Sequence, residues 1–265
     1  MDISKLNEFE KGLLTYAGED RVEPANVLFA HAKKQTGSIV TFKTGFPTLD
    51  RHLGNLEPGE MTGVSGPPGN GKSLFCQSIT MSLAEQEVPS LWFSFEMPWR
   101  QFLTRFHQDY LPRFYGPMKL SQRSIPWIET RIWEAKLKFG CTAVFVDHLH
   151  FLLDMARVKN VSLEIGAIVR KLKLLAIKHN LIFFLVAHTV KAKQDHEFGL
   201  GDIRDSGMIE AECDNVLYIW RNQKQENSSV VKIAKNRKMG FIDKKIPLIL
   251  TNEYGVLRLR EEQKS

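Results

Sequence analysis

Continuous apolar runs alternate along this chain with stretches whose apolar residues recur at helical spacing. The runs predict strands at 61–65, 90–95, 142–146, 181–187, 214–220, 230–235 and 246–250. The helical spacing predicts helices at 73–86, 98–110, 124–139 and 161–179. Runs such as Ala143–Val146 and Leu181–Val186 show no polar alternation, which is typical of strands covered on both faces. We therefore predict an α/β fold: a mainly parallel, twisted sheet flanked by helices.

The two ends of the chain differ from this middle part. Residues 1–45 hold two short patches of helical spacing, and 45 residues are too few for a separate core. We predict a helical extension at 1–45 that docks on this domain or on a neighbouring subunit, with a rigid lead-in at 44–50. The main domain is predicted at 46–260, with an antiparallel hairpin at one sheet edge, and a frayed tail at 261–265.

A phosphate-binding loop stands between the first predicted strand and the first predicted helix of that domain. Residues 66–73 read G-P-P-G-N-G-K-S and fit the pattern G-x-x-x-x-G-K-[ST]. Such glycines let backbone amides wrap a phosphate, the lysine reaches the β- and γ-phosphates, and the serine ligates Mg²⁺. The predicted nucleotide-binding residues are Gly66, Pro67, Pro68, Gly69, Asn70, Gly71, Lys72, Ser73 and Leu74. The sequence therefore predicts a protein that binds ATP and Mg²⁺.

Three polar residues follow other predicted strands. Asp147 is expected to hold the Mg²⁺ shell together with Ser73. Glu96 is placed to polarise an attacking water, the alternative being an acid in the first turn of a helix. His188 is placed to touch the γ-phosphate, the alternative being a structural histidine. A water-activating carboxylate favours a hydrolase over a simple kinase.

Composition narrows the class of protein further. The chain has 265 residues, is 43% hydrophobic and carries a formal net charge of +6, which permits a polyanionic partner without requiring one. The odd number of cysteines, Cys76, Cys141 and Cys213, argues against a disulfide framework and fits core positions in a reducing compartment. No apolar run has membrane-spanning length and no signal core precedes the domain. A cytoplasmic protein is expected.

The order of several motifs resembles one family. The motifs are T-G-F-P-T-L-D at 44–50, the phosphate loop, F-S-F-E-M at 93–97, V-D-H-L at 146–149, G-D-I-R-D-S-G-M-I-E at 201–210 and A-K-N-R at 234–237. Together they resemble the RecA-fold motor domain of DnaB-type replicative helicases. This resemblance covers roughly residues 40–260 of the chain.

The resemblance implies roles for individual residues. Glu96 corresponds to the catalytic glutamate, Asp147 to the Walker B aspartate and His188 to a polar γ-phosphate sensor. Lys235 and Arg237 correspond to a basic pair that reaches the adjacent subunit's nucleotide, with Arg237 as the arginine finger, and Arg221 to an arginine beside the adenine. The implied DNA-binding residues are Lys191, Lys193, Arg204, Asp205 and Gly207. Taken without the resemblance, 191–207 also fits a solvated surface loop, and Lys235–Lys238 a solvated charge run.

The implied function is an ATP-dependent DNA helicase of 5′-to-3′ polarity. Its partners would be single-stranded DNA, further copies of the chain in a hexameric ring, and a replication loader or primase. Two alternatives stay open on the residues alone. One is a RecA-fold paralogue that acts as a mediator, loader or regulator without unwinding. The other is a phosphoryl transferase acting on a small molecule, which would need no finger from a neighbour.

Overall fold

The computed structural model describes residues 3–18, 20–35, 40–106, 111–153, 160–188, 206–222, 225–240, 243–253 and 255–262. The chain divides into two compact units, Met1–Ile39 and Val40–Ser265. The smaller unit contains the 3₁₀ turn η1 (Ile3–Lys5) and the helices α1 (Glu8–Leu14) and α2 (Ala25–Gln35). Helix α1 begins at a capping box, in which Asn7 accepts from the Glu10 amide and Glu10 accepts from the Asn7 amide. None of the side chains whose burial is described in this unit is buried.

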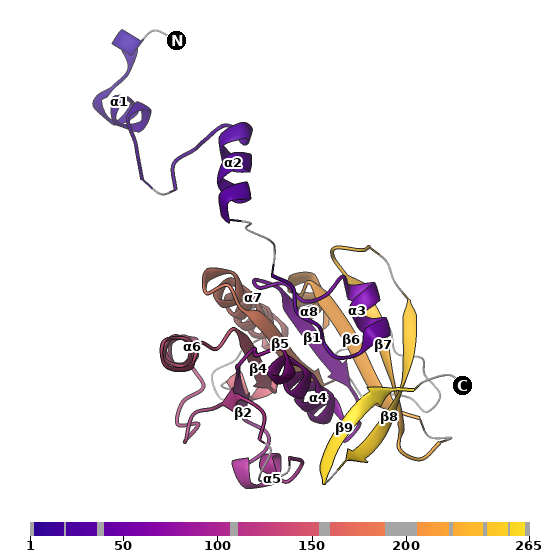
Figure 1. Cartoon of the computed structure of the whole chain (residues 1–265). Helices are drawn as coiled ribbons and strands as arrows, with labels where there is room; N and C mark the ends of the chain where they lie inside the picture. The colour runs from indigo at the N-terminus through magenta and orange to yellow at the C-terminus, as the bar shows by residue number, and fades with distance from the viewer. Residues whose placement is uncertain are drawn as a thin grey trace. The chain divides into compact units, whose positions relative to one another are not determined.

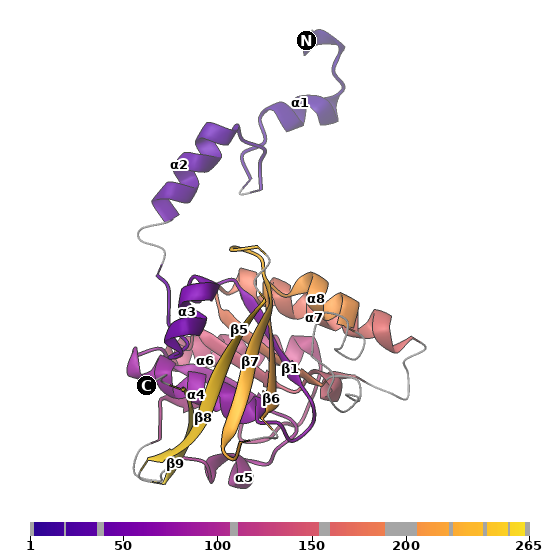
Figure 2. The same cartoon turned by 90° about the vertical axis from the view of Figure 1, so that its right-hand side faces the viewer.

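The larger unit is built on a sheet with nine strands among the described residues. They are β1 (Met61–Gly66), β2 (Ser90–Ser94), β3 (Phe114–Tyr115), β4 (Ala143–Asp147), β5 (Ile182–His188), β6 (Asn215–Arg221), β7 (Ser228–Asn236), β8 (Lys244–Glu253) and β9 (Val256–Glu261). Their order is β3-β2-β4-β5-β1-β6-β7-β8-β9. Strands β3 to β6 in this order are parallel. Strands β7, β8 and β9 add antiparallel neighbours at one edge, as Figure 2 shows.

Helices cover both faces of the parallel part (Figure 1). They are α3 (Pro47–Leu53), α4 (Lys72–Glu85), α5 (Trp99–Leu103), α6 (Ile125–Phe139), α7 (Val161–Lys178) and α8 (Ser206–Glu212), with the 3₁₀ turn η2 (Leu149–Leu152) after β4. Helices α3, α4 and α5 pack on one face, and α6, α7 and α8 on the other. The predicted α/β sheet with an antiparallel edge is confirmed.

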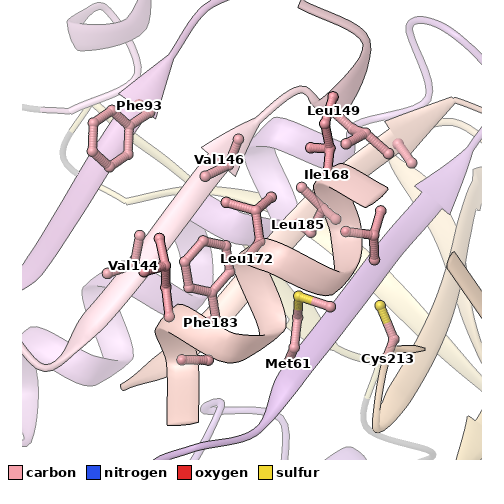
Figure 3. Close-up of a cluster of buried hydrophobic side chains, with 14 of the residues drawn as sticks. Met61, Phe93, Val144, Val146, Leu149, Ile168, Leu172, Phe183, Leu185 and Cys213 are labelled. Carbon is pink, nitrogen blue, oxygen red and sulfur yellow. The ribbon is translucent and has the colours of Figure 1, made fainter. Parts of the chain in front are cut away.

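Strand periodicity divides the core into two layers. In β5, Phe183 and Leu185 face α7, whose Leu172 packs against them (Figure 3). Phe184 points to the opposite face, where its ring stacks on Phe145 at 4.7 Å between centroids. All five side chains are at most 1% exposed, and burying each stabilises the fold by about 1.5–3 kcal/mol. The continuous apolar runs of the sequence arise because both faces of these strands are covered.

Several elements differ from the sequence prediction. The lead-in at 44–50 ends in helix α3, whose Asp50 carboxylate accepts from both the amide and the hydroxyl of Thr44 at 2.7 Å. Helix α5 ends at Leu103 instead of continuing towards residue 110, and residues 107–110 lie outside the described part. Strands β3 and β9 and helix α8 were not predicted. Glu261, expected in a frayed tail, ends β9 and accepts from the amides of Thr48 and Leu49.

Candidate active site

The parallel strands carry their polar end residues to one edge of the sheet. Across the order β2-β4-β5-β1-β6, that edge presents Glu96 after β2, Asp147 at the end of β4, His188 at the end of β5, the phosphate loop after β1, and Arg221 at the end of β6. Residues far apart in the sequence therefore become neighbours. The carboxyl edge of a parallel sheet is where ligands bind in open α/β folds.

The phosphate loop is held in place by its first glycine. A Cβ at Gly66 would lie 2.0 Å from the Ile219 carbonyl oxygen of β6, so only glycine fits this close approach. Gly69 and Gly71 have φ of 72° and 89°, the left-handed region in which side chains are strained. Gly71 caps helix α4, so the amides of the first helical turn point towards the loop. This geometry can cradle an anion.

Lys72 lies within this loop and is buried. Its ammonium donates to the carbonyls of Gly66 and Pro67, both at 2.9 Å. Burial lowers the pKa of this ammonium to about 8, although the charges of Glu96 and Asp147 oppose the shift. A cation held in a partly dry loop interacts strongly with phosphate oxygens, because little solvent screens it.

Ser73 and Asp147 form the metal-binding part of the site. The Ser73 hydroxyl donates to Oδ2 of Asp147 at 2.6 Å, and Asp147 is fully buried. Its other oxygen, Oδ1, is buried with no hydrogen-bond partner. A hydroxyl beside a carboxylate that has an unused buried oxygen suits a hard divalent cation, so these residues fit Mg²⁺.

Asp147→Asn is expected to stabilise the nucleotide-free protein at neutral pH. Burial raises the pKa of Asp147 from 3.8 to about 6. The folded state therefore holds this proton more tightly than the unfolded state, and stability falls as the pH rises from about 4 to about 6. At ~1.4 kcal/mol for each pKa unit, the ionised carboxylate costs about 3 kcal/mol.

Thermal melts between pH 4 and pH 8 measure this effect. Asparagine stays neutral, so the variant should melt several degrees above the wild type at pH 7, and the difference should shrink towards pH 4. Ser73→Ala is the control, since it removes the hydrogen bond to Asp147 and leaves the carboxylate in place. An Asp147→Asn variant that melts below the wild type at pH 7 would contradict the account.

Glu96 lies beside two histidines. Its Oε2 is 3.8 Å from Nε2 of His148 and 3.9 Å from Nε2 of His188, and the two imidazole centroids are 4.1 Å apart. The amides of Phe95 and Glu96 both donate to the Asp147 carbonyl, which fixes the start of this segment against β4. The Glu96 side chain is 41% exposed. It can therefore contact a water molecule at the mouth of the site.

Burial sets the charge of both imidazoles. It lowers the pKa of His148 to about 3 and that of His188 to about 4, and the Lys72 ammonium lowers both further. Both rings are neutral at pH 7, so each offers one donor and one acceptor nitrogen. His188 can in this form donate to a phosphate oxygen without adding a full charge.

Arg221 lies at the far side of the phosphate loop. Its backbone amide donates to Oδ1 of Asn70 at 2.8 Å, which ties the end of β6 to the loop. A pocket of about 470 Å³ opens beside it, with Leu74, Leu250 and Leu259 among its lining residues. An apolar wall with an arginine at its rim suits a planar base attached to a phosphate chain.

Lys235 and Arg237 lie away from the other predicted site residues. Asn236 is level with Asn215 and, through it, with Thr62, four residues before Gly66 in β1. That offset is about 13 Å along the sheet at ~3.3 Å for each residue. The structure therefore does not bring Arg237 to its own phosphate loop.

Both side chains instead contact the end of helix α8. The Lys235 ammonium donates to the carbonyls of Glu210 and Cys213. The Arg237 guanidinium donates to the Ala211 carbonyl and to the Asp214 carboxylate, both at 3.0 Å, and its side chain is 52% exposed. Cations at a helix C-terminus are favoured by the exposed carbonyls there. Arg237 is thus anchored at its base and open to solvent beyond it.

A sequence description of the DnaB-like helicase C-terminal domain matches residues 41–110 and 119–254. The chain belongs to this family. Among curated relatives, it is 25% identical over 240 residues to the replicative DNA helicase DnaB of Geobacillus stearothermophilus, covering 76% of this chain and 53% of the relative. It is 26% identical over 247 residues to that of Haemophilus influenzae, covering 80% and 52%. The chain therefore spans about half the length of these DnaB proteins.

Solved structures share the fold. A DnaB-like replicative helicase studied for its interactions with primase superposes with a TM-score of 0.72 at 20% identity, covering 92% of this chain and 69% of that one. An ATPase domain solved by itself gives a TM-score of 0.71 at 20% identity, covering 88% of this chain and 96% of that domain. The predicted family and fold are confirmed.

Part of the DNA-binding prediction falls outside the described residues of this DnaB-like domain. Those residues are Lys191, Lys193, Arg204 and Asp205. Gly207, expected in a loop, lies in helix α8, and a Cβ there would meet no atom within 4 Å. The loop prediction is wrong at this position, since the chain is helical from Ser206.

Two residues that sequence analysis gave no role also reach the DnaB-like site. His148 was part of a quoted motif, and its place directly after Asp147 was the only signal for it. Arg105 donates to Oε1 of Gln77 at 3.0 Å. Burial lowers its pKa, and the charges of Asp147 and Glu96 oppose that shift. Nothing in the sequence indicated that a turn after α5 would bring an arginine near these carboxylates.

Proposed function

We propose that this chain is an ATP-dependent DNA helicase motor that forms a hexameric ring around single-stranded DNA. One observation carries the proposal: Glu96, Asp147, His188, the phosphate loop and Arg221 line one sheet edge in order. Membership of the DnaB-like family supports the same activity. The relatives named replicative DNA helicases support a role in DNA replication.

The proposed chemistry divides between two groups of residues. Glu96 accepts a proton from the attacking water, and Lys72 stabilises the charge that develops on the phosphates. His188 donates to the γ-phosphate and reports its loss to the segment that follows β5. Mg²⁺, held by Ser73 and Asp147, supplies charge neutralisation on the phosphate oxygens when bound.

The remaining groups come from a neighbouring copy. Arg237 lies too far along the sheet for its own nucleotide and is half exposed, so we assign it, with Lys235, to the nucleotide of the adjacent subunit. Lys191, Lys193, Arg204, Asp205 and Gly207 are assigned to the DNA backbone, which basic side chains and backbone amides bind without reading sequence. Residues 1–45 expose Phe9 and Phe29 at 75% and 71%, and we assign this extension to packing on a neighbouring copy.

ATP hydrolysis with and without single-stranded DNA, at increasing protein concentration, tests this function. A ring whose sites are shared predicts that turnover for each subunit rises with protein concentration and rises again with DNA. A strand-displacement assay then separates a helicase from a loader or mediator. Turnover that ignores both DNA and protein concentration would contradict the ring motor.

A further inference from the structure

Glu96, His148 and His188 form a cluster that their separate roles do not explain. Each offers one potential ligand atom, and these atoms all lie within 4.8 Å of one another. The three residues come from the ends of β2, β4 and β5, three adjacent strands of the sheet. Since those strands are fixed by their ladders and by the core beneath them, the cluster is held by the fold.

The chemistry of this set differs from that of the Mg²⁺ residues. Ser73 and Asp147 offer only oxygen atoms, which suit hard cations. Two imidazole nitrogens with one carboxylate oxygen instead suit a borderline-soft cation such as Zn²⁺, and catalytic zinc sites use this ligand set with an open fourth position. The two sites should therefore select different metals.

The spacing is close to what coordination needs. Oε2 of Glu96 lies 3.8 and 3.9 Å from the two imidazole Nε2 atoms. Ligand atoms around a tetrahedral zinc with bonds of ~2.1 Å stand ~3.4 Å apart. The half-exposed Glu96 side chain can supply the missing few tenths of an ångström by rotating, while the more buried imidazoles stay in place.

We propose that Glu96, His148 and His188 bind Zn²⁺ or a similar borderline-soft divalent cation, and that this binding inhibits ATP hydrolysis. The metal site stands on the geometry alone, whereas the inhibition rests on the function proposed above. A cation held here occupies the Glu96 carboxylate that would activate water and the His188 nitrogen that would reach the γ-phosphate. The site is thus a metal-sensitive brake on the motor.

Neighbouring groups affect affinity without removing the site. The Lys72 ammonium opposes a second cation, and the carboxylates of Asp147 and Glu96 offset it. Nδ1 of His148 accepts from the His150 amide at 3.3 Å, so coordination through Nε2 moves the ring proton to Nδ1 and loses this long hydrogen bond. Such a loss costs at most about tenfold in affinity.

Direct metal binding is the first test, on the full chain without nucleotide. Co²⁺ serves as the probe, because a nitrogen- and oxygen-ligated tetrahedral Co²⁺ absorbs visible light, and Zn²⁺ should abolish the signal by displacement. His148→Ala and His188→Gln should each weaken Co²⁺ binding by about 100-fold or more, since each removes a ligand. His179→Ala is the matched control, because His179 also faces a glutamate, Glu129 at 3.1 Å, away from the site. Circular dichroism checks that each variant is folded.

Inhibition is measured separately, each protein against its own rate without Zn²⁺. Wild type should lose Mg·ATP hydrolysis as Zn²⁺ is added, and His188→Gln, which keeps a donor near the γ-phosphate, should need about 100-fold more Zn²⁺. Co²⁺ binding that is equal in wild type, His148→Ala and His188→Gln would overturn the metal site. Binding without inhibition would overturn the brake alone, and absence of any hydrolysis would fail the proposed function while leaving the site standing.

Discussion

Glu96→Gln is expected to lower ATP hydrolysis by about 10²–10⁴-fold while Mg·ATP binding is retained. Glutamine keeps the size and hydrogen-bonding capacity of the side chain but cannot accept the proton of the attacking water. The phosphate loop, Ser73 and Asp147 are unchanged, so nucleotide affinity should stay within a few-fold. Steady-state turnover and the equilibrium binding of a fluorescent ATP analogue measure the two quantities.

Glu129→Gln is the matched control for this variant. Glu129, like Glu96, faces a histidine, and it lies on α6 away from the sheet edge that carries the site. Its loss should leave turnover unchanged. If Glu96→Gln hydrolysed ATP at the wild-type rate, the assignment of Glu96 as the base would be wrong and the alternative of a first-turn helix acid would hold.

Arg237→Ala is expected to lower turnover by about 10³-fold or more, because an arginine finger contributes that much to phosphoryl transfer. The effect should reach the nucleotide of the neighbour, since Arg237 lies at the opposite end of the sheet from its own phosphate loop. Folding should change little. Asp214, which pairs with Arg237, keeps a second partner in Lys173 at 2.5 Å.

Arg170→Ala provides the comparison for Arg237→Ala. Arg170 also pairs with a carboxylate at the end of α8, Glu212 at 2.8 Å, so it controls for the loss of an exposed ion pair in this region. Steady-state turnover at a protein concentration that saturates assembly measures both variants. An Arg237→Ala variant as active as Arg170→Ala would remove the finger from the account.

Much of the fold could be predicted because buried parallel strands are legible in sequence. Leu181–Val186 is apolar on both faces, and the phosphate loop sits in a fixed strand-loop-helix context. Strand β9 could not be predicted, because Arg258 and Arg260 interrupt it and only Leu259 is buried. Helix α3 has seven residues, too few for its apolar spacing to stand out, and its stability depends on tertiary contacts.

The site was predictable residue by residue but not as an arrangement. Strand ends identify Glu96, Asp147 and His188 as candidates, yet only the strand order makes them neighbours. That order depends on pairings far apart in the chain, which local patterns do not encode. The contact of His148 with Glu96 and the distance of Arg237 from its own phosphate loop both follow from it.

Mixing the two inactive variants tests the shared site most directly. Glu96→Gln subunits keep Arg237, and Arg237→Ala subunits keep Glu96, so about a quarter of the interfaces in a randomly mixed ring are complete. The account predicts that an equal mixture, allowed to exchange subunits in the presence of single-stranded DNA, hydrolyses ATP well above either variant alone. A mixture no more active than its two components would contradict a nucleotide site shared between subunits.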